Sequence, residues 1–137
     1  MGGVFSSSEE RVVSEWMDSG NTTLSLSGMN LLIIPKIPQT EQLKTLKLFS
    51  NNITSESFIE SCSDLLKQPC IEKLFVASNS LGNLENIPLP YSLEEIDLGR
   101  NKITHFSLQH PEKLHLTDIS LDYNSFIEFP INLLLIQ

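Results

Sequence analysis

The sequence contains little cysteine and no cluster of basic residues, and these two absences exclude several classes of protein. Only Cys62 and Cys70 are present among 137 residues, too few for a disulfide framework. We interpret both as small buried apolar residues in a reducing compartment, with pairing to each other as the alternative. Nine Lys and Arg against 17 Asp and Glu give a formal charge of -8. This acidic balance argues against binding to nucleic acid or to anionic lipid surfaces.

Long apolar runs, secretory signals and enzyme motifs are also absent. No stretch approaches the roughly 20 apolar residues that span a bilayer, and residues 1–11 lack the basic start and apolar run of a signal peptide. We therefore expect a cytoplasmic protein in which the sequons at Asn21 and Asn52 are unused. The chain has no glycine-rich phosphate loop and no G-x-S-x-G motif. We expect it not to be an enzyme and to bind no cofactor.

The sequence also argues against a metal site. His105, His110 and His115 are evenly spaced, but this spacing places them on no shared helical face. The acidic residues of the second half are spread along a predicted sheet, whereas calcium needs six to eight oxygens that converge on one point. We therefore expect no bound metal.

Internal repetition is the strongest positive feature of the chain. The pattern L-x-x-L-x-L-x-x-N-x-L recurs four times with all five key positions filled. The copies are Leu43, Leu46, Leu48, Asn51, Ile53; Ile71, Leu74, Val76, Asn79, Leu81; Leu93, Ile96, Leu98, Asn101, Ile103; and Leu116, Ile119, Leu121, Asn124, Phe126. A degenerate copy begins at Asn21, with Met29 in place of the asparagine. Starts at about 21, 43, 71, 93 and 116 give periods of 22, 28, 22 and 23 residues.

This pattern resembles that of the leucine-rich-repeat superfamily over residues 21–137. The resemblance implies an α/β fold: a solenoid in the form of a curved right-handed coil, with a parallel sheet on its concave side. Most units have the typical short period, and the 28-residue unit resembles the ribonuclease-inhibitor-like repeat. Extracellular members of the superfamily have cysteine-rich caps, which this chain lacks. Pro35, Pro88 and Pro130 match the ending with which the family turns the chain back towards the next strand.

Two elements are predicted within the repeats. Asn51, Asn79, Asn101 and Asn124 are expected to form a ladder of hydrogen bonds to backbone groups that would otherwise be buried and unpaired. Residues 55–69 supply the extra length of the 28-residue unit, and their apolar residues recur at helical steps. We therefore predict a helix there, ended by Pro69.

The chain divides into three predicted parts. Residues 1–6 form a flexible leader, residues 7–20 an N-terminal cap helix, and residues 21–137 the repeats. Ser7 and Glu10 have capping-box spacing, and Trp16 lies on an apolar helix face that is expected to cover the first repeat. No C-terminal cap is recognisable, which leaves an exposed apolar edge. Either the chain is the N-terminal part of a longer protein, the favoured explanation, or another element covers that edge.

Alternation along each strand predicts which side chains face the concave side. Phe49 and Phe75 lie there on neighbouring strands, either as anchors for a partner or as aromatics that cover each other. Charge changes along the same face, from Lys44, Lys47 and Lys73 to Glu94, Glu95, Asp97, Asp118 and Asp122; a merely soluble face is the alternative. The predicted partner-binding residues are Lys47, Phe49, Lys73, Phe75, Glu95, Asp97, Arg100, Asp118, Asp122 and Tyr123.

These features predict a protein–protein interaction module that binds a partner on its concave sheet. The resemblance leaves open a second reading, the N-terminal regulatory or targeting segment of a larger signalling enzyme such as a protein phosphatase or kinase. Residues 1–6 match the myristoylation pattern M-G-x-x-x-[ST], with Gly2 as the acceptor; an unmodified leader is the alternative. One acyl chain would give only weak, reversible membrane association.

Overall fold

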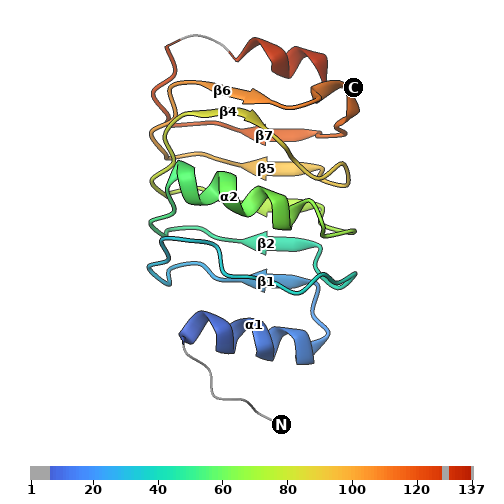
Figure 1. The fold of residues 1–137 in the computed structure, drawn as a ribbon. Helices are drawn as coiled ribbons and strands as arrows, with labels where there is room; N and C mark the ends of the chain where they lie inside the picture. The colour runs from blue at the N-terminus through green and yellow to red at the C-terminus, as the bar shows by residue number, and fades with distance from the viewer. Residues whose placement is uncertain (1–6, 128–129, 137) are drawn as a thin grey trace.

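The fold is built on a parallel five-stranded sheet with the strand order β1-β2-β3-β5-β7 (Figure 1). The computed structural model describes residues 7–127 and 130–136. The strands are β1 (Thr23–Ser25), β2 (Thr45–Lys47), β3 (Lys73–Phe75), β5 (Glu95–Asp97) and β7 (Asp118–Ser120). Together with its helices, this sheet confirms the predicted α/β class.

The strand register follows the repeat that the sequence predicts. The first residues of the strands align across the sheet as Thr23, Thr45, Lys73, Glu95 and Asp118. These positions are 22, 28, 22 and 23 residues apart, as predicted. The central residue of each strand points away from solvent, so Leu24, Leu46, Leu74 and Ile96 are almost completely buried. One period of sequence therefore adds one strand and one aliphatic layer to the core.

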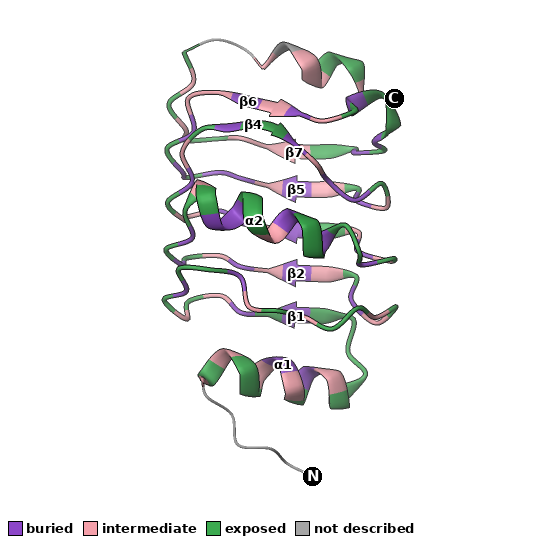
Figure 2. Ribbon diagram, viewed as in Figure 1, coloured by how far each residue is buried: buried purple, intermediate pink, exposed green. Residues whose placement is uncertain are grey.

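One helix and a second, smaller sheet cover one side of the five-stranded sheet (Figure 1). The helix α2 (Ser55–Leu65) occupies the extra length of the 28-residue unit, as predicted. It buries Phe58, Cys62 and Leu65 in the core and leaves the opposite face of the helix exposed (Figure 2). The helix ends at Leu65 rather than at the predicted Pro69, because the α-helical bonds give way to tighter turn bonds from the Lys67 N–H to the Asp64 carbonyl and from the Gln68 N–H to the Leu65 carbonyl, both 3.1 Å.

The small sheet consists of β4 (Leu84–Ile87) and β6 (Phe106–Leu108), which run parallel. The sequence did not predict these strands. They belong to the return segments of neighbouring repeats, and their pairing places Leu84, Ile87, Phe106 and Leu108 in the core. The core is thus a layer of aliphatic side chains between two sheets of unequal length.

The predicted asparagine ladder is confirmed. The Asn101 Oδ1 accepts hydrogen bonds from the N–H groups of Asn79 (3.1 Å) and Leu81 (3.0 Å) in the preceding repeat. Its Nδ2 donates to the carbonyls of Val76 (3.2 Å) and Leu98 (3.0 Å). Asn51, Asn79 and Asn124 make corresponding bonds to the repeats that precede their own. Each asparagine therefore joins two successive repeats by their backbones.

The helix α1 (Ser8–Ser19) covers the β1 end of the molecule. Its first turn is capped where the Ser7 Oγ accepts from the Glu10 N–H at 3.3 Å, as the spacing predicted. Trp16 is 6% exposed and packs in the core, which confirms its predicted role in cap packing. The Gln42 Nε2 donates to the Trp16 and Asn21 carbonyls, both at 2.9 Å, and so ties the cap to the second repeat.

The opposite end of the described chain is covered only in part. Two short 3-10 helices, η1 (Pro111–Lys113) and η2 (Ile131–Leu135), lie at this end. The Asn132 Oδ1 accepts from the Leu108 N–H (3.3 Å), and its Nδ2 donates to the Leu108 carbonyl (2.9 Å), so η2 packs beside β6. At the outer edge of β7, Ile119 and Leu121 are only half-buried, whereas their counterparts in inner repeats are fully buried.

The two cysteines are free and differ in environment. Cys62 is buried in α2, as predicted, and burial raises the pKa of its thiol to about 12. Cys70 is half-buried in the loop after α2, so the prediction that it belongs to the core is wrong. Within the described ranges, neither α1 nor α2 has the length and apolarity needed to cross a bilayer.

The ladder makes a direct prediction about stability. Asn101→Leu removes the partners of buried backbone groups, so it should lower the free energy of unfolding by about 1–3 kcal/mol. Urea denaturation followed by circular dichroism measures this change. Asn52→Leu is the matched control, because the Asn52 side chain is exposed and bonds only to Asn30 among the described residues. Equal stability of the two variants would contradict the ladder's role.

The cysteines make a second prediction. The thiolate is the reactive form of cysteine, so the buried Cys62 should resist iodoacetamide at neutral pH in the native protein. Cys70 should react readily, and Cys62 should react only in urea. Mass spectrometry of the labelled peptides separates the two sites, and Cys70→Ser provides a chain with Cys62 alone. Rapid labelling of Cys62 in that native variant would show that the packing of α2 is wrong.

Candidate functional site

The side of the five-stranded sheet away from α2, β4 and β6 is covered by no described helix or strand (Figure 1). We call it the open face. It consists of Thr23, Ser25, Ser27, Thr45, Lys47, Phe49, Lys73, Phe75, Ala77, Glu95, Asp97, Gly99, Asp118, Ser120 and Asp122. These side chains alternate with buried aliphatics, as Lys47 does between Leu46 and Leu48, so the pleat directs them outward.

Two phenylalanines form an aromatic pair at the middle of the open face. The centroids of the Phe49 and Phe75 rings are 5.3 Å apart, and their planes differ by 16°, a stacked arrangement. Lys47 is the register partner of Phe75, so Phe49 lies diagonally across from Phe75 and level with Ala77. Each ring is half-buried. The rings therefore cover each other in part and still offer apolar surface to solvent.

Hydrogen bonds at the sheet's end fix the position of Phe49. Its backbone N–H donates to the Ser27 Oγ at 3.0 Å, and the next residue, Ser50, donates to the Ala77 carbonyl at 3.1 Å. Phe49 is thus held between β1 and β3 by its neighbours on both sides. A side chain on such a rigid backbone can present an apolar surface with little loss of conformational entropy on binding.

Acidic side chains gather on the β5 and β7 part of the open face. We call Glu95, Asp97, Asp118 and Asp122 the acidic half. Glu95 lies 3.9 Å from the Lys73 Nζ of the neighbouring strand, an exposed and therefore weak ion pair. The Asp97 Oδ1 accepts a hydrogen bond from the Gly99 N–H at 2.9 Å, which fixes the position of this carboxylate beside a residue that has no side chain. A Cβ atom at Gly99 would lie 3.1 Å from that same oxygen, so the position is closely packed.

Arg100 and Tyr123 border the acidic half at the turn that follows each strand. The Arg100 guanidinium carbon lies 4.3 Å from the centroid of the Tyr123 ring. Both residues adopt the left-handed backbone conformation, with φ of 52° and 58°. Gly28, Ser50 and Ser78 take the same conformation at the equivalent turn of the other repeats. The sequence gives no signal for this turn, because only one of its five positions is glycine.

The structure places all ten predicted partner-binding residues on the open face or at its border. It groups them as the aromatic pair, the flanking lysines Lys47 and Lys73, the acidic half, and the Arg100–Tyr123 stack. Gly2, the predicted lipidation site, lies outside the described residues. The roles of these residues therefore stay predictions at this point.

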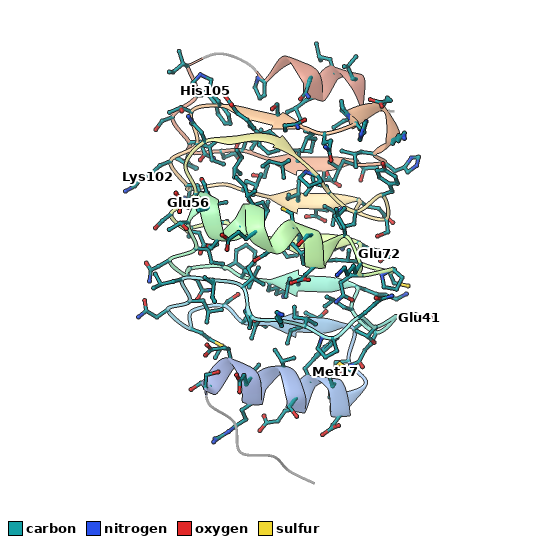
Figure 3. The ribbon with its side chains drawn as sticks, in the orientation of Figure 1. Met17, Glu41, Glu56, Glu72, Lys102 and His105 are labelled. Atoms are coloured by element: carbon teal, nitrogen blue, oxygen red, sulfur yellow. The ribbon has the colours of Figure 1, made fainter. Side chains whose placement is uncertain are left out.

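A small cavity and several charged side chains of the described residues lie away from the open face. In residues 7–127 and 130–136, no three His, Cys, Asp or Glu side chains are grouped as a metal site. Figure 3 shows Glu41 and Glu72 at one end of the strands and Glu56, Lys102 and His105 at the other. A cavity of about 80 Å³ lies on the α2 side, lined by Leu66, Pro88, Leu89, Tyr91, Gln109 and His110. It is well below the roughly 300–1,000 Å³ of a typical ligand pocket.

Comparison with known proteins returned no match: no family model, no curated protein and no solved structure is similar to the chain. The function of the chain is therefore inferred from the chemistry of the open face.

Proposed function

We propose that the chain is a leucine-rich-repeat solenoid that binds a partner protein through its open face, the side that the sequence predicts to be concave. The repeat-length register of the strands and the asparagine ladder support the first part of the proposal. The residues of the open face support the second part. Binding without catalysis is the function that these residues favour.

The single observation that carries the proposal is the aromatic pair. The positions equivalent to Phe75 hold Ser25, Lys47, Asp97 and Ser120 in the other repeats. The positions equivalent to Phe49 hold Ser27, Ala77, Gly99 and Asp122. Small or polar residues therefore suffice for folding at this place in the sheet. Exposed aromatic surface that folding does not need is typical of the anchor of a protein interface.

Replacing the pair tests the proposal. The double variant Phe49→Ala/Phe75→Ala should lose its cellular partner in affinity capture with the native N-terminus, because truncation of an interface anchor commonly costs about 2 kcal/mol or more. Its circular-dichroism spectrum should stay that of the parent, because both rings lie outside the buried core.

A matched control removes apolar surface from the other side. Leu32 and Ile33 are 64% and 62% exposed. The Leu32 carbonyl accepts from the Ser57 Oγ of α2, which places this pair on the α2 side. Leu32→Ala/Ile33→Ala should retain the partner. Capture that survives loss of both phenylalanines, or that disappears in the control, would show that the open face is not the binding site.

A further inference from the structure

The charges on the open face are separated by strand. Lys47 and Lys73 flank the aromatic pair on β2 and β3. All four carboxylates of the acidic half lie on β5, on β7 or at the turn after β7. The neighbouring cation is Arg100, at the turn after β5. A partner that covers the aromatic pair and extends over β5 and β7 therefore meets a surplus of negative charge.

Three of these carboxylates form no ion pair with a residue in the described part of the chain. Glu95 has Lys73 at 3.9 Å, but no Lys, Arg or His nitrogen lies within ion-pair distance of Asp97, Asp118 or Asp122. Arg100 stacks on Tyr123 instead of pairing with an acid. Asp118 and Asp122 are exposed, and Asp97 is half-buried beside Phe75's strand. These groups keep unused capacity for charge-assisted hydrogen bonds from a ligand.

We propose that the open face binds an extended basic–aromatic segment of a partner protein. The inference rests on the proposed function and adds the chemistry of the partner. An aromatic or branched aliphatic side chain of the segment packs on Phe49 and Phe75. Its Lys or Arg side chains, directed towards β7, reach Asp97, Asp118 and Asp122.

The spacing of the strands sets the spacing of the segment. Neighbouring strands lie about 4.8 Å apart, so β7 is about 10 Å from β3 across β5. An extended chain advances about 3.4 Å per residue. The apolar anchor and the basic residue that reaches β7 should therefore be about two or three residues apart. Small residues lie along this path, because Ala77 and Gly99 separate Phe49 from Asp122 at the same level of the sheet.

Charge also argues against two other occupants of the face. A second copy of this chain would bring the four carboxylates of its own acidic half against two lysines, and a formal charge of -8, to the same surface. A nucleic acid would bring phosphates to carboxylates. Both contacts are repulsive, whereas a basic segment is steered towards the face and oriented on it.

Peptide selection on the full chain tests the inference. A library of random dodecapeptides is selected on the native protein and counter-selected on Phe49→Ala/Phe75→Ala, which leaves only peptides that need the aromatic pair. The expected sequences carry an aromatic or aliphatic residue followed or preceded at two or three positions by Lys or Arg, with few Asp or Glu. Fluorescence polarisation then measures the affinity of the best synthetic peptide.

Charge variants separate specific recognition from the general negative charge. Asp118→Asn/Asp122→Asn should weaken the best peptide by about tenfold, since charge-paired contacts of this kind are worth about 1.4 kcal/mol or more. It should also reduce the loss of affinity between about 0.1 M and about 1 M salt. Glu60→Gln/Glu85→Gln makes the same change in net charge on exposed residues of α2 and β4 and should leave the affinity unchanged.

The outcomes distinguish this inference from the proposed function. Selected peptides that are acidic or uncharged, or that bind the double variant Asp118→Asn/Asp122→Asn as tightly as the parent, overturn the inference. A selection that yields no peptide dependent on the aromatic pair overturns it as well. In these cases capture of the cellular partner by the parent, with loss in Phe49→Ala/Phe75→Ala, still supports partner binding on the open face.

Discussion

The structure depends on the hydrogen bonds of the ladder asparagines together with the aliphatic layer beneath them. A chain that turns inward after each short strand must bury peptide groups that no strand can pair. The asparagine amide satisfies groups of its own repeat and of the preceding one, as Asn101 does with Leu98 and Leu81. Each repeat is thus incomplete without its neighbour, and stacking follows from this need. The parallel sheet and its open face are consequences of that stacking.

The same constraint explains where the two ends differ. At the β1 end, α1 supplies apolar side chains and Gln42 joins its last turn to the second repeat. At the other end, η2 satisfies the backbone of β6 through Asn132, while the outer edge of β7 has no strand beside it in the described residues. Ile119, Leu121 and Phe126 are half-buried for this reason. The layer that is closed elsewhere by a following repeat is closed here only in part.

The sequence predicts those features that repeat with the period of the chain. Strand positions, the asparagine ladder, the α2 helix and the Ser7 cap follow from periodicity or spacing, because one side-chain pattern determines each of them. The pairing of β4 with β6 was missed, because the return segments lack a regular alternation. The left-handed turns were missed as well, since tertiary bonds such as Arg100 N–H to the Asp122 carbonyl (2.8 Å) hold them without glycine. The alternation along each strand predicts which residues lie on the open face. The stacking of the two aromatic rings depends on rotamers that no sequence pattern encodes.

Hydroxyl-radical footprinting of the captured complex measures most directly whether the open face is the binding surface, because it reports the solvent exposure of individual side chains. The account predicts that oxidation of Phe49 and Phe75 falls when the partner binds, whereas oxidation of Leu32 and Ile33 on the α2 side does not change. Unchanged oxidation of both phenylalanines in the complex, with protection on the α2 side, would contradict it.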